Sequence, residues 1–201
     1  MKKFIYLLII SLAFQASALT IPEGYKLATV KLPRGAVTML GVCQKDAETM
    51  AVCTWEGEVW EYKAGAWSLF ADNLMEPNGI YYDAKEDAYY VAQKPELTRL
   101  QDTNKDGKAD IYESYCAKFG WSGSYHEYHF GPVVDSMGRK YASLNLAARP
   151  GKDGIEVRDG RPGQHGLMCY TAPYRGWVYR TDRPGHFQPI ATGFRSPCGI
   201  G

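Results

Sequence analysis

The segment Gly79-Ile80-Tyr81-Tyr82-Asp83, followed after a polar turn by Tyr89-Tyr90-Val91-Ala92, decides the fold of this chain. Aromatic and β-branched residues on both sides of a short turn predict two antiparallel strands. The pattern recurs in residues 40–43 with 50–53, in residues 131–135 with 141–144, and at the start of a fourth copy in residues 199–201. The sequence is therefore built from repeats of one strand pair.

The outer part of the repeat is also present twice. Gly57-Glu58-Val59-Trp60-Glu61-Tyr62 with residues 73–80 matches Gly176-Trp177-Val178-Tyr179-Arg180-Thr181 with residues 192–200, at an offset of 119 to 120 positions. Repeats of about 40 residues with several short strands are typical of propeller blades, which stack because one sheet cannot bury both faces. We predict an all-β protein, a β-propeller with about three and a half blades in residues 35–201, out of the roughly 4 to 8 that close a ring.

The N-terminus predicts export. Lys2 and Lys3 precede an apolar run from Phe4 to Phe14, and Ala16-Ser17-Ala18 has the small residues that a signal peptidase accepts. We interpret residues 1–18 as a signal peptide. The alternative is a retained membrane anchor, although the run is shorter than the ~20 residues that span a bilayer. Residues 19–34 are then an N-terminal lead-in strand, and the protein is expected in the periplasm or cell envelope.

The net charge of the chain limits the classes of partner that it is expected to bind. Without residues 1–18 there are 21 basic and 22 acidic side chains, a net charge of −1 with no cluster of one sign. A surface of this kind does not attract nucleic acid or an anionic membrane. We therefore expect no nucleic-acid partner.

The chain has five cysteines, and none of them forms a CxxC or CxxCH pattern. A structural zinc site of the usual spacing and a c-type haem site are therefore absent from the sequence. Cys43 and Cys53 flank the turn at residues 46–48 symmetrically. Both a disulfide across the hairpin and two buried thiols fit this spacing.

Unequal spacing of the repeats indicates two insertions, in residues 101–124 and 147–175. The glycines that open successive copies, Gly41, Gly79, Gly131 and Gly199, are 38, 52 and 68 residues apart. Insertions on a rigid scaffold often carry function. Residues 147–175 are rich in Gly, Pro and Arg without any period, which fits a long surface loop near a channel mouth or a mobile loop without a role.

Residues 102–113 match the calcium-loop pattern D-x-[DN]-x-[DN]-G-x5-E at every position. Calcium binds oxygen atoms, which the pattern supplies from Asp102, Asn104, Asp106, the Lys108 carbonyl, Asp110 and Glu113. Pro95 precedes the loop and no helical period follows it, so we expect the loop alone, between two strands, as a structural calcium site. The alternative is a polar turn that binds no metal.

The run Gln93-Lys94-Pro95-Glu96-Leu97-Thr98-Arg99-Leu100, followed by this loop, resembles the propeller domain of a family of membrane-bound dehydrogenases. Those proteins are similar in turn to the soluble quinoprotein glucose/sorbosone dehydrogenases, which are six-bladed β-propellers. The resemblance spans about residues 35–201. It implies that a sugar or alcohol is oxidised by pyrroloquinoline quinone, and that the electrons pass to an acceptor domain or protein.

The resemblance also implies two site residues. His126, five residues before Gly131-Pro132, stands where that family has its general base, and a buried structural histidine is the alternative. Gly193-Phe194-Arg195-Ser196-Pro197-Cys198-Gly199 is similar to the family's G-x-R-N-P-x-G, which makes Arg195 a candidate quinone contact. Ser196 replaces the asparagine of that motif, and the aspartate expected after the third strand pair is missing, with Asn145 nearest.

Alternation along residues 125–129 predicts a strand in which His126 and Tyr128 share one face and Glu127 and His129 the other. Two other functions remain open. Glu76-Pro77-Asn78-Gly79-Ile80 also resembles motifs of calcium-dependent lactonase propellers, which are hydrolases with a metal in the channel. A non-catalytic recognition propeller, with Trp55, Trp60, Trp121 and Trp177 as contact surface, is the third possibility.

Overall fold

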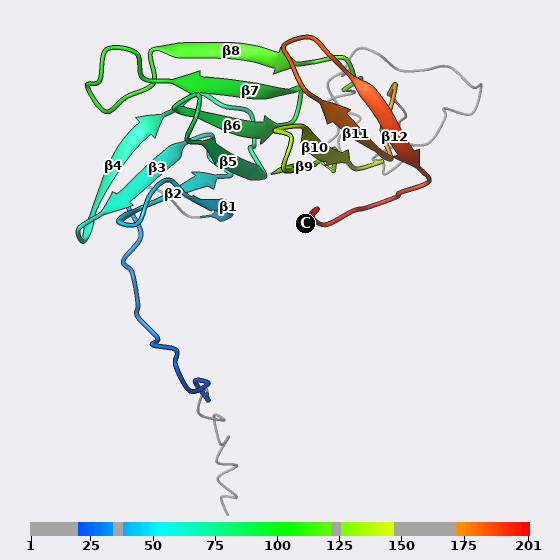
Figure 1. Ribbon diagram of the computed structural model, residues 1–201. Coiled ribbons are helices and arrows are strands. Elements are labelled where there is room, and N and C mark those ends of the chain that lie inside the picture. The colour runs from blue at the N-terminus through cyan, green and yellow to red at the C-terminus, as the bar shows by residue number, and fades with distance from the viewer. Residues whose placement is uncertain (1–19, 34–37, 122–125, 147–171) are drawn as a thin grey trace, which may run out of the picture. The chain divides into compact units, whose positions relative to one another are not determined.

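The computed structural model describes residues 20–33, 38–121, 126–146 and 172–201, which contain twelve strands and no helix. The strands form three antiparallel sheets of four, and each sheet pairs its strands in chain order (Figure 1). Blade 1 contains β1 (Met39–Gln44), β2 (Thr49–Thr54), β3 (Val59–Lys63) and β4 (Ala66–Ala71). Blade 2 contains β5 (Gly79–Asp83), β6 (Ala88–Gln93), β7 (Glu96–Gln101) and β8 (Ile111–Cys116). Blade 3 contains β9 (His129–Val134), β10 (Lys140–Leu144), β11 (Trp177–Thr181) and β12 (Gln188–Thr192).

These sheets confirm the predicted all-β propeller fold, with three blades in the described residues. The two copies of the outer repeat also adopt the same local structure. Gly57 and Gly176 both have positive φ, 96° and 77°. The Leu74 amide donates to the Gly57 carbonyl at 3.0 Å, and the Phe194 amide donates to the Gly176 carbonyl at 3.2 Å. The offset of about 120 residues is therefore a structural repeat.

Each of the inner strands β1, β5 and β9 contains a glycine where neighbouring blades come closest: Gly41, Gly79 and Gly131. A Cβ atom on Gly41 would lie 2.9 Å from the Gly79 Cα, and one on Gly79 would lie 1.9 Å from the Gly131 carbonyl oxygen. A Cβ on Gly131 would in turn lie 3.2 Å from Ile200. Each repeat thus touches the next one at its glycine, and residues 199–201 take the corresponding place beside β9.

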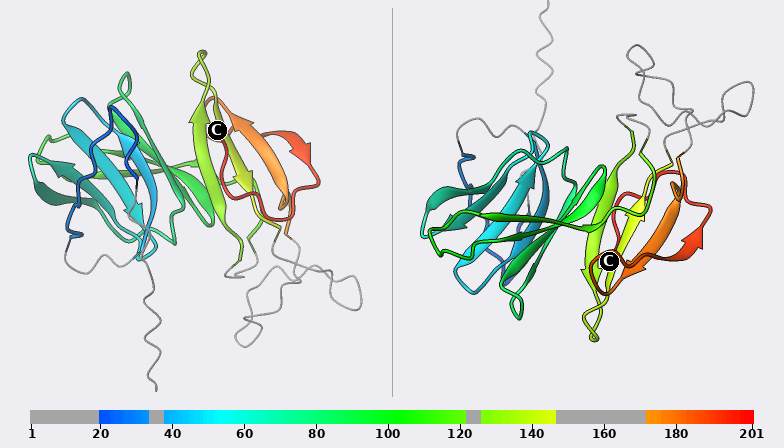
Figure 2. Two further views of the ribbon diagram at one scale, coloured as in Figure 1. Left: turned by 90° about the horizontal axis from the view of Figure 1, so that it is seen from below. Right: turned by 90° about the horizontal axis from the view of Figure 1, so that it is seen from above.

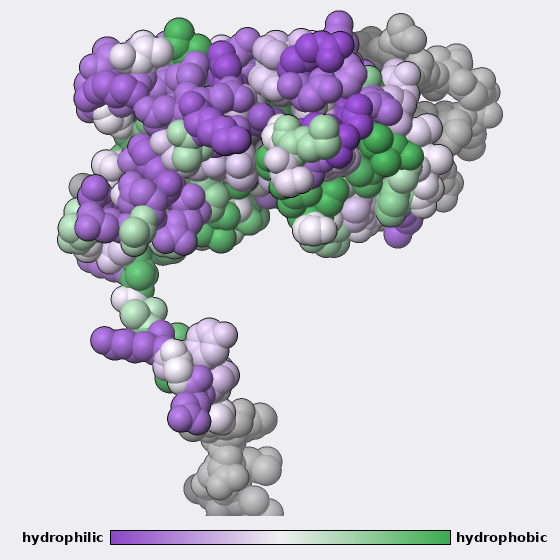
Figure 3. All heavy atoms as spheres, in the orientation of Figure 1, coloured by the Kyte–Doolittle hydropathy of each residue, from purple (hydrophilic) through white to green (hydrophobic). Residues whose placement is uncertain are grey.

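The core lies between the blades. One apolar cluster joins blades 1 and 2 and includes Phe70, Tyr89 and Leu100. A second cluster joins blades 2 and 3 and includes Tyr90, Leu144 and Tyr179. Figure 2 shows blade 2 in the middle, and its strand β6 is buried along its whole length. In Figure 3, hydrophilic residues cover β7 and β8, whereas apolar residues gather near β9 and the C-terminal residues.

A lysine surrounded by aromatic rings spans each junction between blades. Lys45 of blade 1 bonds Glu61 at 2.8 Å and lies 5.6 Å from the Tyr82 and Tyr89 rings of blade 2. Lys140 of blade 3 lies 4.0 Å from the Tyr90 ring of blade 2. Burying a charge is costly unless other charges and π faces replace water. Lys140, 3% exposed, meets that requirement only when the blades are in contact, because Asp83 and Glu86 belong to blade 2, whereas the half-buried Lys45 has Glu61 in its own blade.

Two sequence predictions need correction. Residues 20–33 form no strand; Gly24 has a φ of 85°, and the Tyr25 amide donates to the Pro22 carbonyl in a turn. Residues 126–128 are not part of a strand either, because β9 begins at His129. In the β1–β2 hairpin, Cys43 lies opposite Ala51 and Cys53 lies opposite Gly41, so the two cysteines lie diagonally and do not face each other.

Both cysteines are thiols, and burial raises the pKa of each to about 12. The signal peptide predicted for residues 1–18 and most of the long loop predicted for residues 147–175 lie outside the described residues. Within the described part of the chain, no helix is long and apolar enough to span a bilayer.

The contact at Gly79 predicts a large effect of a single methyl group. We expect Gly79→Ala to destabilise the protein by about 3 kcal/mol, because the new Cβ would overlap the Gly131 backbone and push β5 and β9 apart. Gly138→Ala is the control, since Gly138 has a φ of 79° but open space around it; we expect a loss of about 1 kcal/mol there. Urea unfolding measures both, and equal losses would contradict the account.

Candidate functional site

Four side chains from three blades meet where β5 and β9 begin, and we call them the axial cluster: Trp55, Glu76, Lys94 and Tyr128. Trp55 directly follows β2, Glu76 lies in the β4–β5 connection, Lys94 directly follows β6, and Tyr128 directly precedes β9. The Lys94 ammonium lies 2.5 Å from the Glu76 carboxylate and 5.5 and 6.0 Å from the Trp55 and Tyr128 rings. The two rings lie edge to face, 5.7 Å apart.

The position of this cluster follows from the blades that supply it. Trp55 belongs to blade 1 and Tyr128 to blade 3, and blade 2 lies between these two blades. Both β1 and β9 contact β5, so residues of blades 1 and 3 come together only beside the inner strands. In a propeller that region surrounds the central channel. The axial cluster is therefore at one end of the channel side of the three blades.

Local structure holds each member in place. The Lys94 amide donates to the Met75 carbonyl at 3.1 Å, which fastens the β4–β5 connection to the end of β6. Glu76 has a φ of 44°, a left-handed conformation that is uncommon for a residue with a side chain. The Asn78 side chain donates to the Glu76 carbonyl at 3.1 Å and stabilises this turn. Backbone strain of this kind is often found at functional sites.

Arg175 connects the loops around the cluster. Its side chain is fully buried with that of Glu127, 3.9 Å away. The guanidinium donates to the carbonyls of Gly120 at 2.8 Å and Lys94 at 2.9 Å, and it makes longer contacts with the carbonyls of Glu127 and Tyr128. Burial lowers the Arg175 pKa to about 10, although Glu127 opposes this, so Arg175 stays charged at neutral pH. One cation thus fixes three chain segments.

His129 is a buried neutral histidine next to this region. Its Nδ1–H donates to the Gln93 carbonyl at 2.8 Å, because a carbonyl only accepts. The neutral ring then accepts at Nε2 from the Tyr179 hydroxyl at 2.9 Å. Burial lowers the pKa of His129 to about 3. Both ring nitrogens are engaged in the blade 2–blade 3 core, which makes His129 a structural residue.

The backbone brings the segments of the two residues named by the resemblance to the same end of blade 3. The Tyr128 amide donates to the His126 carbonyl, and the Asn145 amide donates to the Tyr128 carbonyl. The Leu146 amide donates to the Arg195 carbonyl at 2.9 Å. His126 is half-buried and Arg195 is exposed. The expected aspartate is again represented only by Asn145, which is buried.

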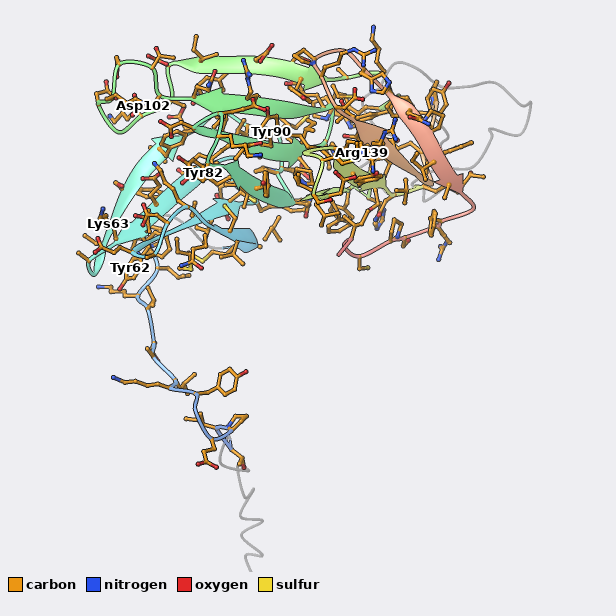
Figure 4. The ribbon with its side chains drawn as sticks, viewed as in Figure 1. Tyr62, Lys63, Tyr82, Tyr90, Asp102 and Arg139 are labelled. Carbon is orange, nitrogen blue, oxygen red and sulfur yellow. The ribbon has the colours of Figure 1, made fainter. Side chains whose placement is uncertain are left out.

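The predicted calcium loop joins β7 to β8 at the other end of blade 2, and strands rather than helices flank it (Figure 4). Asp102 accepts from the Gly107 amide at 2.9 Å, Asp106 accepts from the Lys108 amide at 2.9 Å, and Asp110 accepts from the Thr103 amide at 3.0 Å. Glu113 instead lies on β8 opposite Arg99 and bonds its Nε at 2.7 Å. Among the described residues, no three His, Cys, Asp or Glu side chains gather as metal ligands.

The same loop also touches blade 1. The Ala109 amide donates to the Phe70 carbonyl of β4 at 2.8 Å, and Ala109 packs against the core between blades 1 and 2. The Tyr112 hydroxyl, just after the loop, accepts from the Asp72 amide at 3.2 Å. Asp102 and Lys105 line a small cavity of 60 Å³ beside Lys45. The loop therefore bridges two blades.

The sequence analysis named the calcium loop, His126 and Arg195 as candidates, and it did not name Lys94, Arg175 or the pairing of Glu76. The repeat alignment contained one signal, because Arg175 precedes Gly176 where Glu56 precedes Gly57 in the first copy. A basic residue at that position marks a departure from the repeat. Nothing local indicates that Lys94 is buried, since its partners Glu76, Trp55 and Tyr128 come from three other connections.

Comparison with known proteins assigns the chain to no family. No protein-family profile and no curated protein matches the sequence. The propeller fold therefore rests on the strand order and on the repeated glycine contacts, and the activity is a matter for proposal.

Proposed function

We propose that this chain belongs to an exported oxidoreductase that oxidises a sugar or another alcohol at the channel end of its blades, with a quinone as acceptor. The observation that carries the proposal is the convergence of side chains from three blades in the axial cluster, beside the segments of His126 and Arg195. Buried charges held by partners from several elements are common at functional sites. The resemblance to quinoprotein dehydrogenases supplies the reaction class.

The residues fit the roles that the reaction requires. Pyrroloquinoline quinone, when bound, supplies the acceptor for the hydride that leaves the alcohol carbon. His126 is half-buried and accepts the proton of the substrate hydroxyl, since imidazole is the side chain that most often acts as base near neutral pH. The exposed Arg195 guanidinium donates to the carbonyl or carboxylate oxygens of the quinone. The electrons then pass to a separate acceptor domain or protein in the periplasm or cell envelope.

The quinone proposal is tested by binding before turnover. We expect calorimetric titration to show quinone binding to the purified full chain, weakened about tenfold or more in Arg195→Ala because a charge-assisted hydrogen bond is lost. Arg183→Ala is the matched control, since Arg183 is exposed in the β11–β12 turn. No binding to the unchanged chain, or the same loss in both variants, would contradict the proposal.

The lactonase alternative is less well supported at Glu76. A metal in the channel would need the Glu76 carboxylate as a ligand if the likeness to lactonase motifs extended to chemistry. That carboxylate is 2.5 Å from the Lys94 ammonium, which is itself buried. Moving Glu76 to a metal would leave Lys94 buried without a counter-charge, at a cost of several kcal/mol. The ion pair therefore favours the oxidoreductase over the hydrolase.

We also propose that the loop of residues 102–110 binds calcium as a structural ion. Carboxylate, amide and carbonyl oxygens are the ligands that calcium prefers, and the loop supplies them from Asp102, Asn104, Asp106, Lys108 and Asp110. Glu113 pairs with Arg99 instead, so water completes the shell. Because Ala109 bonds blade 1, an ion in this loop would hold blades 1 and 2 together.

Calcium should therefore stabilise the protein. We expect about 2.7 kcal/mol at a free calcium concentration one hundred times the dissociation constant, seen as a rise in Tm that a chelator reverses. Asp106→Asn should abolish the rise, whereas Glu113→Gln should retain it. Asp46→Asn is the control, because Asp46 makes similar amide contacts in the β1–β2 turn outside the motif. An unchanged Tm with calcium would refute the site.

A further inference from the structure

We infer that the Glu76–Lys94 ion pair, between Trp55 and Tyr128, is the subsite that holds two neighbouring hydroxyl groups of the substrate. The inference rests on the proposed function and goes beyond it, because it names the recognising residues and the substrate feature, a vicinal diol. His126 and Arg195 are not part of this subsite.

The first argument is the accessibility of the carboxylate. The Glu76 side chain is 30% exposed, whereas that of Lys94 is 3% exposed. Lys94 contacts Oε2, which is buried, so Oε1, with its two lone pairs, is the carboxylate oxygen left for a ligand. These lone pairs point to a group that donates hydrogen bonds. Two hydroxyl groups on adjacent carbons suit this oxygen, because each can donate to one of its two lone pairs.

The second argument is the charge of the pair. Lys94 neutralises Glu76, so the subsite does not select a cationic ligand. One face of the Trp55 ring and one face of the Tyr128 ring are directed at the Lys94 ammonium, which would repel a second cation bound beside it. An anion would meet the exposed carboxylate directly. A neutral ligand that donates hydrogen bonds is the class that fits.

The third argument is the apolar surface beside the pair. Trp55 and Tyr128 are both half-buried, so part of each aromatic side chain stays accessible. Aromatic residues combine a large apolar surface with a polar group, and they pack well against the C–H groups of a sugar ring. A pyranose with neighbouring hydroxyl groups matches both parts of the subsite.

The experiment is a titration of the purified full chain with D-glucose in the absence of quinone. The indole ¹⁵N signal of Trp55, assigned with a Trp55→Phe variant, reports binding. Tetrahydropyran-2-methanol, which has the ring and one hydroxyl but no vicinal diol, is the comparison ligand. We expect a shift that saturates with D-glucose and none with the comparison ligand.

The variant pair separates recognition from folding. Glu76→Gln with Lys94→Met removes both charges at similar volume and should weaken D-glucose binding about tenfold or more, as expected when hydrogen bonds to a charged group are lost. Glu61→Gln with Lys45→Met is the matched control, because Lys45 also bonds a glutamate beside aromatic rings, between blades 1 and 2. Binding should be unchanged there.

Three results would overturn the inference: no shift with D-glucose in the unchanged chain, an equal shift with the comparison ligand, or equal weakening in both double variants. Quinone binding is measured separately. Diol binding without quinone binding would support this subsite and refute the oxidoreductase. Quinone binding without diol binding would support the oxidoreductase and refute this subsite.

Discussion

The close approach of the inner strands is the constraint on which the rest of the structure depends. Gly41, Gly79 and Gly131 lie where β1, β5 and β9 meet, and a side chain at Gly79 would overlap the next blade. Only because these strands approach so closely do Trp55 of blade 1 and Tyr128 of blade 3 come into contact across blade 2. The axial cluster is therefore a consequence of backbone packing.

Charged residues are used at both ends of the blades in a similar way. Lys45, Lys94 and Lys140 each combine a carboxylate with aromatic rings from a neighbouring blade. Such pairs add little net stability compared with apolar packing, but a mispaired blade would leave the buried Lys140 without its carboxylates Asp83 and Glu86. These ion pairs thus favour one alignment of neighbouring blades over others. At the axial cluster the same arrangement leaves the Glu76 side chain 30% exposed, and this is where we propose that a ligand binds.

Much of the fold was predictable from the sequence, because the strand pairs and the glycine of each inner strand are local and repeated. Less of the candidate site could be predicted from the sequence. Residues 126–128 alternate like a strand, yet the Tyr128 amide turns back to the His126 carbonyl, and Arg175 binds the carbonyls that a strand partner would need. Glu113 completes a calcium pattern by spacing, but β8 places it opposite Arg99. In both cases a residue distant in sequence decides the outcome, and one sequence contains no record of such a contact.

The most direct test of the account is the contact between the glycines themselves. Nuclear Overhauser effects, measured in a uniformly labelled sample, report pairs of protons that lie close together in space. The account predicts cross-peaks between the α-protons of Gly41 and the backbone protons of Gly79 and Ile80, and between those of Gly79 and the backbone of Gly131. If the spectra show ordered hairpins without these cross-peaks, the blades are not packed through their inner strands and the axial cluster does not form.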